Sequence, residues 1–469
     1  MDPRTVQISV VIAYLFALLA VGAYKVRRIH THADFTLAGR GLSTFVLFGT
    51  MLATWIGTGS VFGNSEKTYE TGLAAWILPA GGVLGILALA PLAPRARRFA
   101  GYTVQDILEA RYAPTARVLG TITLVIAYVT IVSYQYRAGG AVIHLLAPNV
   151  SVETATILAA AFVILYTALA GMVSVAYTDV VNGIVMLAGF LVALPLLWSR
   201  VGGVEGMSAA LPAEHLRFLG PIGFREAIAL TLPSFLLVLG DANMYQRFFS
   251  ARTPEVAARA VRTLALGVLF LEIAIILAAW MGSALAPGLD APGRVLAVVA
   301  RDHVPVALGS LLLAAIVAIV VSTADSYLLV PATCLVRDVW QRFLRPDADE
   351  RELVRVSRAV VVVLGILAWT LTKLSDRFLA VALWAYTMYG AGITPSLLAA
   401  FLWPRATKQG AVASIATGIT LTIGWELHPL VPGIDTVYVA LLGSVTALVG
   451  VSLATPPPEH GGRLEASPR

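Results

Sequence analysis

Long apolar blocks recur along the whole chain and limit its fold more than any other feature. They run for roughly 18 to 30 positions, and about 20 helical residues are needed to cross the hydrocarbon core of a bilayer. The hydrophobic fraction is 58% and the charged fraction is 13%, whereas ordinary globular domains carry about 25% charged residues. A soluble chain of 469 residues would show periodic polar faces instead. The sequence therefore predicts an all-α membrane protein.

Apolar length, interrupted by glycine, proline and charge, predicts about 13 transmembrane helices. They are expected at 6–24, 44–64, 73–93, 118–147, 153–171, 174–199, 226–246, 261–286, 304–335, 357–375, 378–403, 411–428 and 436–454. Residues 1–454 are expected to form a single polytopic domain, and residues 455–469 a short polar cytoplasmic tail.

Lysine and arginine gather in alternate loops, which predicts the orientation of the chain. One side receives Lys25, Arg27, Arg28, Arg40, Arg95, Arg97, Arg98, Arg111, Arg117, Arg247, Arg252, Arg259, Arg262, the cluster from Arg337 to Arg358, Arg405 and Lys408. The other side has only scattered cations. We therefore expect a multi-pass protein of the inner cell membrane, with the N-terminus outside and the C-terminus in the cytoplasm.

Composition also argues against several other classes. The net charge is +6, but no basic run is long enough to indicate nucleic-acid binding. Cys334 is the single cysteine, so the chain can form no internal disulfide or cysteine-based metal site. The seven histidines form no HExxH or comparable group, and we expect no enzyme. The short tail offers no signalling domain of the kind a receptor needs.

The second predicted span is interrupted near its middle by Gly57-Thr58-Gly59. Glycines on both sides of a threonine weaken a helix and leave backbone carbonyls free to bind an ion or a solute. Such glycines could equally serve close packing between helices. The motif alone leaves both interpretations open.

The seventh predicted span repeats this theme, because Pro233 lies inside it and Gly240-Asp241 follows. Proline removes a backbone hydrogen bond from a helix. Interrupted helices five spans apart are typical of two inverted five-helix repeats with a binding site between them. The repeats are expected at about 44–199 and 226–403.

The ninth predicted span carries Ser322-Thr323-Ala324-Asp325-Ser326 between apolar runs. Side-chain oxygens are costly to bury in a membrane, yet they suit a hard cation that prefers oxygen ligands. A lone Ser or Thr usually bonds its own backbone, but that explanation does not cover Asp325. Ala53 lies about 14 Å from one end of its predicted helix, and Ser322 lies about 27 Å along its own. We therefore expect both residues in the inner half of the membrane. Asp179 is either a further carboxylate at this cluster or an interfacial polar residue.

At these residues the chain resembles the sodium:solute symporter family. The resemblance runs in order over nearly the whole chain. It rests on residues 37–40 (LAGR), 53–57 (ATWIG), 177–179 (YTD), 240–241 with 246–247 (GD and QR), 322–326 with 337–338 (STADS and RD), 394–395 (TP), 403–404 (WP) and 407–411 (TKQGA). It implies a LeuT-like fold and sodium-coupled uptake by alternating access.

The resemblance also implies where sodium binds. The main sodium is expected at the carbonyls of Ala53, Ile56 and Ile319 and the hydroxyls of Ser322 and Thr323. Some members of the family bind a further sodium with an acidic residue at the position of Asp179. Asp325 and Ser326 would lie next to that second sodium site. Ile319 departs from the small residue often found at its position, which a carbonyl ligand tolerates.

The solute is expected midway across the membrane, against the interrupted second span and facing spans three, seven and eleven. Candidates for contacting it are Trp55, Gly57, Ser60, Tyr134 and Gln135. Arg137 either holds an anionic solute or extends to the outer surface. Glu272 is an intramembrane carboxylate and hence a functional candidate, unless it is protonated or paired with a neighbour.

Two mechanisms remain open for a carrier of this kind. The first is a symporter that uses Na+ as the coupling ion to import a small polar organic solute. The second is a proton-coupled carrier of the same fold that uses Asp179, Asp325 or Glu272 as its proton site. The expected partners are a small-molecule solute and the lipid bilayer, and the sequence leaves the oligomeric state open.

Overall fold

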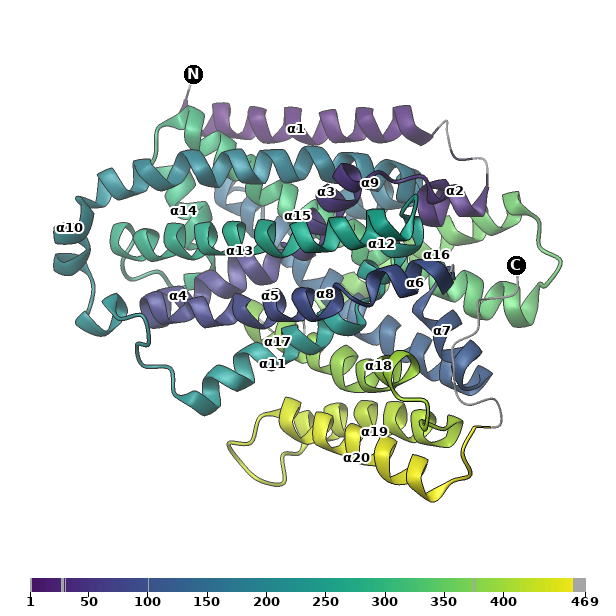
Figure 1. Ribbon diagram of the computed structural model, residues 1–469. Helices are drawn as coiled ribbons and strands as arrows, with labels where there is room; N and C mark the ends of the chain where they lie inside the picture. Colours follow the sequence, from purple (N-terminus) through teal and green to yellow (C-terminus); the bar gives the residue numbers. More distant parts are fainter. Residues whose placement is uncertain are drawn as a thin grey trace.

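The computed structural model describes residues 2–26, 29, 31–99, 101–373, 375 and 377–458, and these fold into a bundle of helices (Figure 1). The first half contains α1 (Pro3–Val26), α2 (His32–Leu37), α3 (Thr44–Trp55), α4 (Asn64–Thr71), α5 (Ile77–Leu89), α6 (Ala93–Phe99), α7 (Val104–Arg111), α8 (Pro114–Leu146), α9 (Val152–Val201) and α10 (Gly203–Ala210). The second half contains α11 (Phe224–Gly240), α12 (Ala242–Ser250), α13 (Pro254–Leu285), α14 (Val295–Asp302), α15 (Val306–Cys334), α16 (Glu350–Leu371), α17 (Phe378–Gly392), α18 (Thr394–Leu402), α19 (Lys408–Leu427) and α20 (Thr436–Ala454).

The helical architecture follows from the environment that the composition dictates. Inside hydrocarbon every backbone N–H and C=O must find a partner within the protein, and a helix provides these partners within one segment. Ten helical runs in the described residues are long and apolar enough to cross a membrane by length and composition. The prediction of an all-α protein is confirmed, whereas the count of 13 spans stays a prediction.

Helix α9 is two helices joined at a sharp reversal. Gly171 has φ 58° and ψ 177°, a backbone conformation that is essentially restricted to glycine. A hydrogen bond joins the hydroxyls of Tyr166 and Thr178, which lie 12 positions apart. In one straight helix these residues would be about 18 Å apart. The chain therefore folds back on itself between the fifth and sixth predicted spans.

Two other helices are interrupted. Helix α3 ends at Trp55, and helical structure resumes through a π-helical turn at Gly59–Gly63 that leads into α4. Helix α11 passes through Pro233 and ends at Gly240; Asp241 then caps α12 by accepting a hydrogen bond from the backbone N–H of Asn243 at 2.9 Å. The proline thus leaves α11 continuous, and the interruption falls at Gly240-Asp241.

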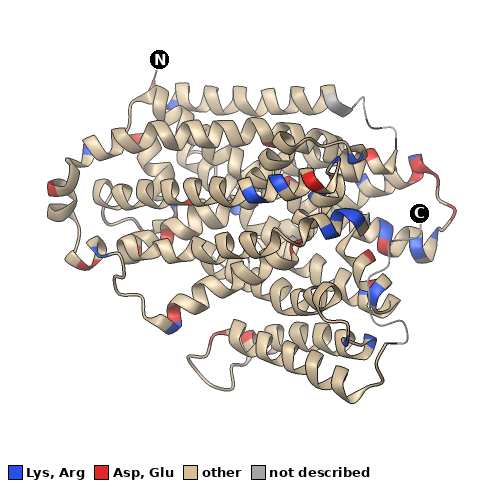
Figure 2. Cartoon of the chain, in the orientation of Figure 1, with Lys and Arg blue, Asp and Glu red and all other residues tan. Residues whose placement is uncertain are grey.

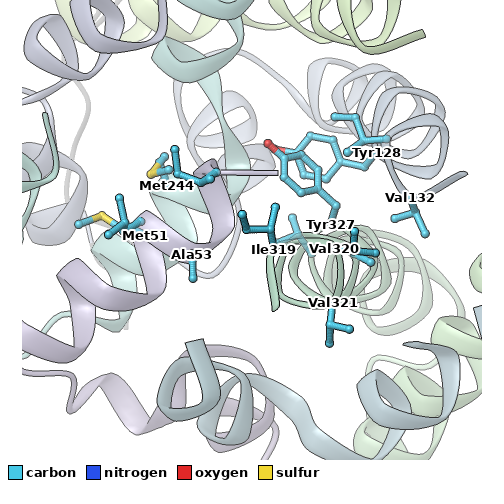
Figure 3. Packing of buried hydrophobic residues seen from close by; sticks show 14 of the residues in the cluster. Met51, Ala53, Tyr128, Val132, Met244, Ile319, Val320, Val321 and Tyr327 are labelled. Atoms are coloured by element: carbon cyan, nitrogen blue, oxygen red, sulfur yellow. The ribbon is translucent and has the colours of Figure 1, made fainter. Parts of the chain in front are cut away.

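The interrupted helices pack in the middle of the bundle. Figure 3 shows Met51 and Ala53 of α3 beside Met244 of α12, with Ile319 and Val320 of α15 next to them. Helix α1 runs along one edge of the molecule, and the hairpin of α19 and α20 lies along the opposite edge (Figure 1). The core therefore holds the two breaks away from lipid, where irregular backbone can be tolerated.

Charged residues gather at the two ends of the bundle, and Lys and Arg are densest at the end that carries α6 and α16 (Figures 1 and 2). Some arginines assigned to loops from the sequence lie inside the protein instead. Arg247 is 0% exposed, and Arg117 is 7% exposed. Because an uncompensated buried charge is costly, each must be paired, and Arg117 forms ion pairs with Asp106, Glu109 and Asp338.

Candidate sodium site and solute cavity

The end of α3 presents backbone carbonyls to α15. The last carbonyls of any helix lack partners within that helix, and here Ile56 turns away with φ −73° and ψ 100°. The hydroxyl of Ser322 donates to the carbonyl of Ala53 at 2.9 Å. The hydroxyl of Thr323 lies 3.1 Å from the Ile56 carbonyl oxygen and 3.4 Å from that of Thr54.

The fifth predicted ligand belongs to the same group, because the carbonyl of Ile319 lies 3.2 Å from the hydroxyl of Ser322. The structure thus brings together Ala53, Ile56, Ile319, Ser322 and Thr323, all at most 3% exposed. Their polar atoms here are carbonyl and hydroxyl oxygens, which is the donor chemistry that a hard monovalent cation prefers. These oxygens fit a sodium ion better than a transition metal.

Gly57 makes this arrangement sterically feasible. A Cβ atom at position 57 would lie 2.9 Å from Cγ2 and 3.1 Å from Oγ1 of Thr323. Any larger side chain would therefore push α15 away from the break. The glycine predicted to weaken the helix also permits close approach to the hydroxyl residues.

A buried charge cluster lies beside these oxygens. Nη2 of Arg247 donates to Oγ1 of Thr54 at 2.5 Å and to Oγ of Ser326 at 2.7 Å. The same nitrogen lies 3.6 Å from Oδ2 of Asp179. Ser326 also donates to Oδ1 of Asp325 at 3.2 Å. The three residues predicted for a second cation therefore lie together, with an arginine among them.

The cluster contains two acidic residues, Asp179 and Asp325, and one basic residue, Arg247. Oδ1 of Asp179 and Oδ2 of Asp325 are buried and have no hydrogen-bond partner within the part of the chain that the structure describes. Arg247 was missed as a member of this site because cations near helix ends count toward loop charge. The adjacent residues Gln246-Arg247, already part of the family resemblance, were the signal that could have identified it.

A cavity lies against the break in α3. The residues that line it are Trp55, Gly59, Ser60, Asn64, Leu78, Pro79, Gly82, Leu230, Ser234, Leu237, Glu272, Tyr327, Leu379, Ala382, Leu383 and Tyr386. They come from the second predicted span and from α5, α11, α13, α15 and α17. Helices α5, α11 and α17 correspond to the third, seventh and eleventh predicted spans, which were expected to face the solute.

The residues predicted to contact the solute are divided between the cavity and its surroundings. Trp55 and Ser60 line the cavity. Gln135 lies behind the break, where its side-chain oxygen accepts a hydrogen bond from the Thr58 backbone N–H at 3.2 Å. The hydroxyl of Tyr134 lies 3.2 Å from that of Tyr386, a lining residue. Gly57, Tyr134 and Gln135 therefore support the lining without belonging to it.

The two charged candidates lie in different places. The guanidinium of Arg137 lies 5.7 Å from the centre of the Phe378 ring and does not line the cavity. Glu272 does line it, and its carboxylate accepts hydrogen bonds from Ser60 at 2.6 Å and from Asn64 at 2.9 Å. Asn64 was missed, although it lies one helical turn after Ser60 and hence on the same face.

Comparison with known proteins agrees with this architecture. The family model described as the sodium:solute symporter family matches residues 35–418, and the chain belongs to this family. It is a multi-pass membrane transporter rather than an enzyme.

Among curated relatives, the sodium/pantothenate symporter of Escherichia coli is 27% identical, and the match covers 96% of both chains. The osmoregulated proline transporter OpuE of Bacillus subtilis is 24% identical, covering 95% of this chain and 94% of the relative. The human high affinity choline transporter is 27% identical, covering 90% and 78%.

Solved structures show the same fold. A Na+-coupled sialic acid symporter in a substrate-bound outward-open state superposes with a TM-score of 0.82 at 20% identity, covering 96% of this chain and 98% of that one. A nucleobase-cation-symport-1 family transporter in a closed conformation gives a TM-score of 0.57 at 13% identity, covering 91% and 96%. The prediction of a LeuT-like fold is confirmed.

Proposed function

We propose that this chain is a sodium-coupled symporter of the inner cell membrane that imports a small polar organic solute by alternating access. The observation that carries this proposal is the group of oxygens around the break in α3. Ser322 and Thr323 of α15 already contact the carbonyls of Ala53, Thr54 and Ile56. Its relatives include a sodium/pantothenate symporter and a Na+-coupled sialic acid symporter, which supports the same conclusion.

A sodium ion at this position would join two helices that must separate for the carrier to reorient. It would share the carbonyls of Ala53, Ile56 and Ile319 with the hydroxyls of Ser322 and Thr323. Each sodium ion that enters across a membrane potential of about 100 mV supplies about 2.3 kcal/mol for uphill transport. The orientation that fits this role has the N-terminus outside and the arginine-rich end in the cytoplasm.

A second cation position between Asp179, Asp325 and Ser326 is part of the proposal. It is supported by the two carboxylate oxygens without hydrogen-bond partners in the described residues. Arg247 supplies one positive charge there against two acidic residues. A proton is the competing occupant and would make the protein a proton-coupled carrier.

The test is the effect of sodium on the thermal stability of the purified protein. Ligand at about 100 times its Kd stabilises a folded protein by about 2.7 kcal/mol. We expect saturating NaCl, compared with KCl at constant ionic strength, to raise the Tm of the wild type. The double substitution Ser322→Ala and Thr323→Ala should remove this rise, because both hydroxyl ligands are lost.

The same helix supplies a matched control. Ser310 and Thr333 donate only to backbone carbonyls one turn earlier in α15, at 2.7 and 2.9 Å. The double substitution Ser310→Ala and Thr333→Ala should keep the sodium-induced rise in Tm. A full sodium response in the Ser322→Ala, Thr323→Ala protein would refute the site. Varying sodium at fixed pH, and varying pH at fixed sodium, separates sodium coupling from proton coupling.

A further inference from the structure

The carboxylate of Glu272 lines the cavity and has no cationic partner among the described residues. Its side chain is 3% exposed and lies in the middle of α13. Both of its hydrogen-bond donors, Ser60 and Asn64, are neutral. Within the described part of the chain, no Lys, Arg or His nitrogen lies within 4 Å of it. A buried acidic group in a membrane protein ordinarily faces a partner or marks a substrate path.

After these two hydrogen bonds, the carboxylate of Glu272 can still accept further hydrogen bonds. Its two oxygens offer about four lone-pair positions, and Ser60 and Asn64 occupy one on each oxygen. The remaining positions suit a donor that arrives with the ligand. A hydrogen bond between two charged groups is about twice as strong as one between neutral groups, and it would offset the cost of burying the carboxylate.

Aromatic rings surround the same cavity. Trp55, Tyr327 and Tyr386 line it together with Glu272. The faces of aromatic rings attract cations, most strongly when water is excluded. By contrast, no Lys or Arg is among the residues that line this cavity in the described chain. The lining therefore favours positive charge and contains no cationic side chain to pair with a carboxylate or phosphate among the described residues.

We propose that the transported solute carries a protonated or quaternary amine, and that Glu272 binds this group within the aromatic lining. This inference rests on the proposed function and names the substrate class of its solute cavity. Glu272 would act as the specificity-determining residue. Ser60 and Asn64 are positioning residues that hold its carboxylate toward the cavity.

The test measures binding of amine-bearing probes by isothermal titration calorimetry in saturating NaCl. The probes are choline, glycine betaine and L-proline, with 3,3-dimethylbutan-1-ol as the uncharged isostere of choline and pantothenate as an anion. We expect at least one amine-bearing probe to bind, and pantothenate not to bind. If that probe is choline, its uncharged isostere should bind at least about tenfold more weakly.

Glu272→Gln keeps the shape of the side chain and removes its charge, so it should weaken the binding of that probe by about tenfold or more. Glu226→Gln makes the same chemical change at the outer end of α11, where the side chain of Glu226 is 46% exposed and pairs with Lys67. It should leave the Kd unchanged. Unaltered affinity in Glu272→Gln, binding of pantothenate alone, or no binding of any amine-bearing probe would each overturn the inference.

The sodium response separates this inference from the proposed function. Glu272→Gln should retain the sodium-induced rise in Tm, because Glu272 is not among the proposed sodium ligands. A wild type without any sodium response would refute sodium coupling itself. A normal sodium response together with unchanged probe affinity in Glu272→Gln would refute only the amine-binding role.

Discussion

At the residue scale, contacts between two hydroxyls of α15 and the backbone carbonyls of α3 define the geometry of the break. The family resemblance implied that the hydroxyls of Ser322 and Thr323 lie near carbonyls of α3, and the similar depth of the two segments in the membrane supported this pairing. Sequence could not show which of the neighbouring polar side chains face the cavity. Tyr134 and Gln135 lie on the correct helix, yet their orientation depends on how α8 packs against α17 and the break.

At the residue scale we predict the effect of Gly57→Ala. The added methyl group would lie 2.9 Å from Cγ2 of Thr323, so α15 must move away from the proposed sodium ligands. We expect a loss of about 1–3 kcal/mol in stability. We also expect sodium affinity to fall about tenfold, since a rise of about 1.4 kcal/mol in binding free energy has that effect. Sodium titrations followed by Tm would measure the affinity, and thermal unfolding without sodium would measure the stability.

Gly424→Ala provides the control for this substitution, because a Cβ atom there would have no heavy atom within 4 Å. It should leave sodium affinity unchanged and stability the same or higher by up to about 1 kcal/mol. Equal sodium affinities in Gly57→Ala and Gly424→Ala would contradict the steric role assigned to Gly57.

At the scale of helices, the positions of the interruptions could be predicted from the sequence, but the contacts that stabilise them could not. The interruption of the seventh span was predicted from Pro233 together with Gly240-Asp241, and α11 continues through Pro233 and ends at Gly240. Two side chains from other helices donate hydrogen bonds to the C-terminal end of α11. The hydroxyl of Tyr389 donates to the Gly240 carbonyl at 2.8 Å, and Tyr128 donates to the carboxylate of Asp241. Because tertiary partners satisfy the freed backbone, the break occurs where these partners are available.

The reversal within α9 supports a second prediction. Gly171→Ala would place a side chain at φ 58° and ψ 177°, with its Cβ atom 2.7 Å from Cδ2 of Phe35. We expect a loss of about 1–3 kcal/mol in stability from the backbone strain alone. Gly450→Ala in α20, where a Cβ atom would meet nothing within 4 Å, should cause no loss. Thermal unfolding of both proteins would measure the difference, and equal Tm values would show that position 171 tolerates a side chain.

At the scale of the whole molecule, buried polar contacts join the helices at one end of the bundle. Asp338 follows α15 and accepts hydrogen bonds from Thr103 and Thr121 at 3.2 Å each, and it pairs with Arg117 at 3.3 Å. These contacts join the end of α15 to α7 and α8. Cys334 lies one turn earlier, buried with its Sγ atom 3.4 Å from the side-chain oxygen of Gln105 on α7.

Cys334 therefore reports whether this end opens. Asp338→Asn removes the one acidic partner of Arg117 that follows α15, while Asp106 and Glu109 stay paired with Arg117, so α15 should separate more often from α7 and α8. We expect N-ethylmaleimide to label Cys334 about tenfold faster or more, because loss of a buried ion pair costs several kcal/mol. Asp302→Asn, which removes the partner of Arg301 at the end of α14, should not alter the rate. Identical labelling rates in the two variants would show that Asp338 does not hold this end closed.

Residues 56–60 would contact both the proposed cation and the lining of the solute cavity. The carbonyl of Ile56 points to the proposed cation, and four positions later the hydroxyl of Ser60 holds Glu272 at the cavity. Cooperativity between cation and solute would then need no chain of intermediary residues, since a single turn of the chain contacts both. Reciprocity requires that whichever ligand arrives first tightens the binding of the other by an equal factor.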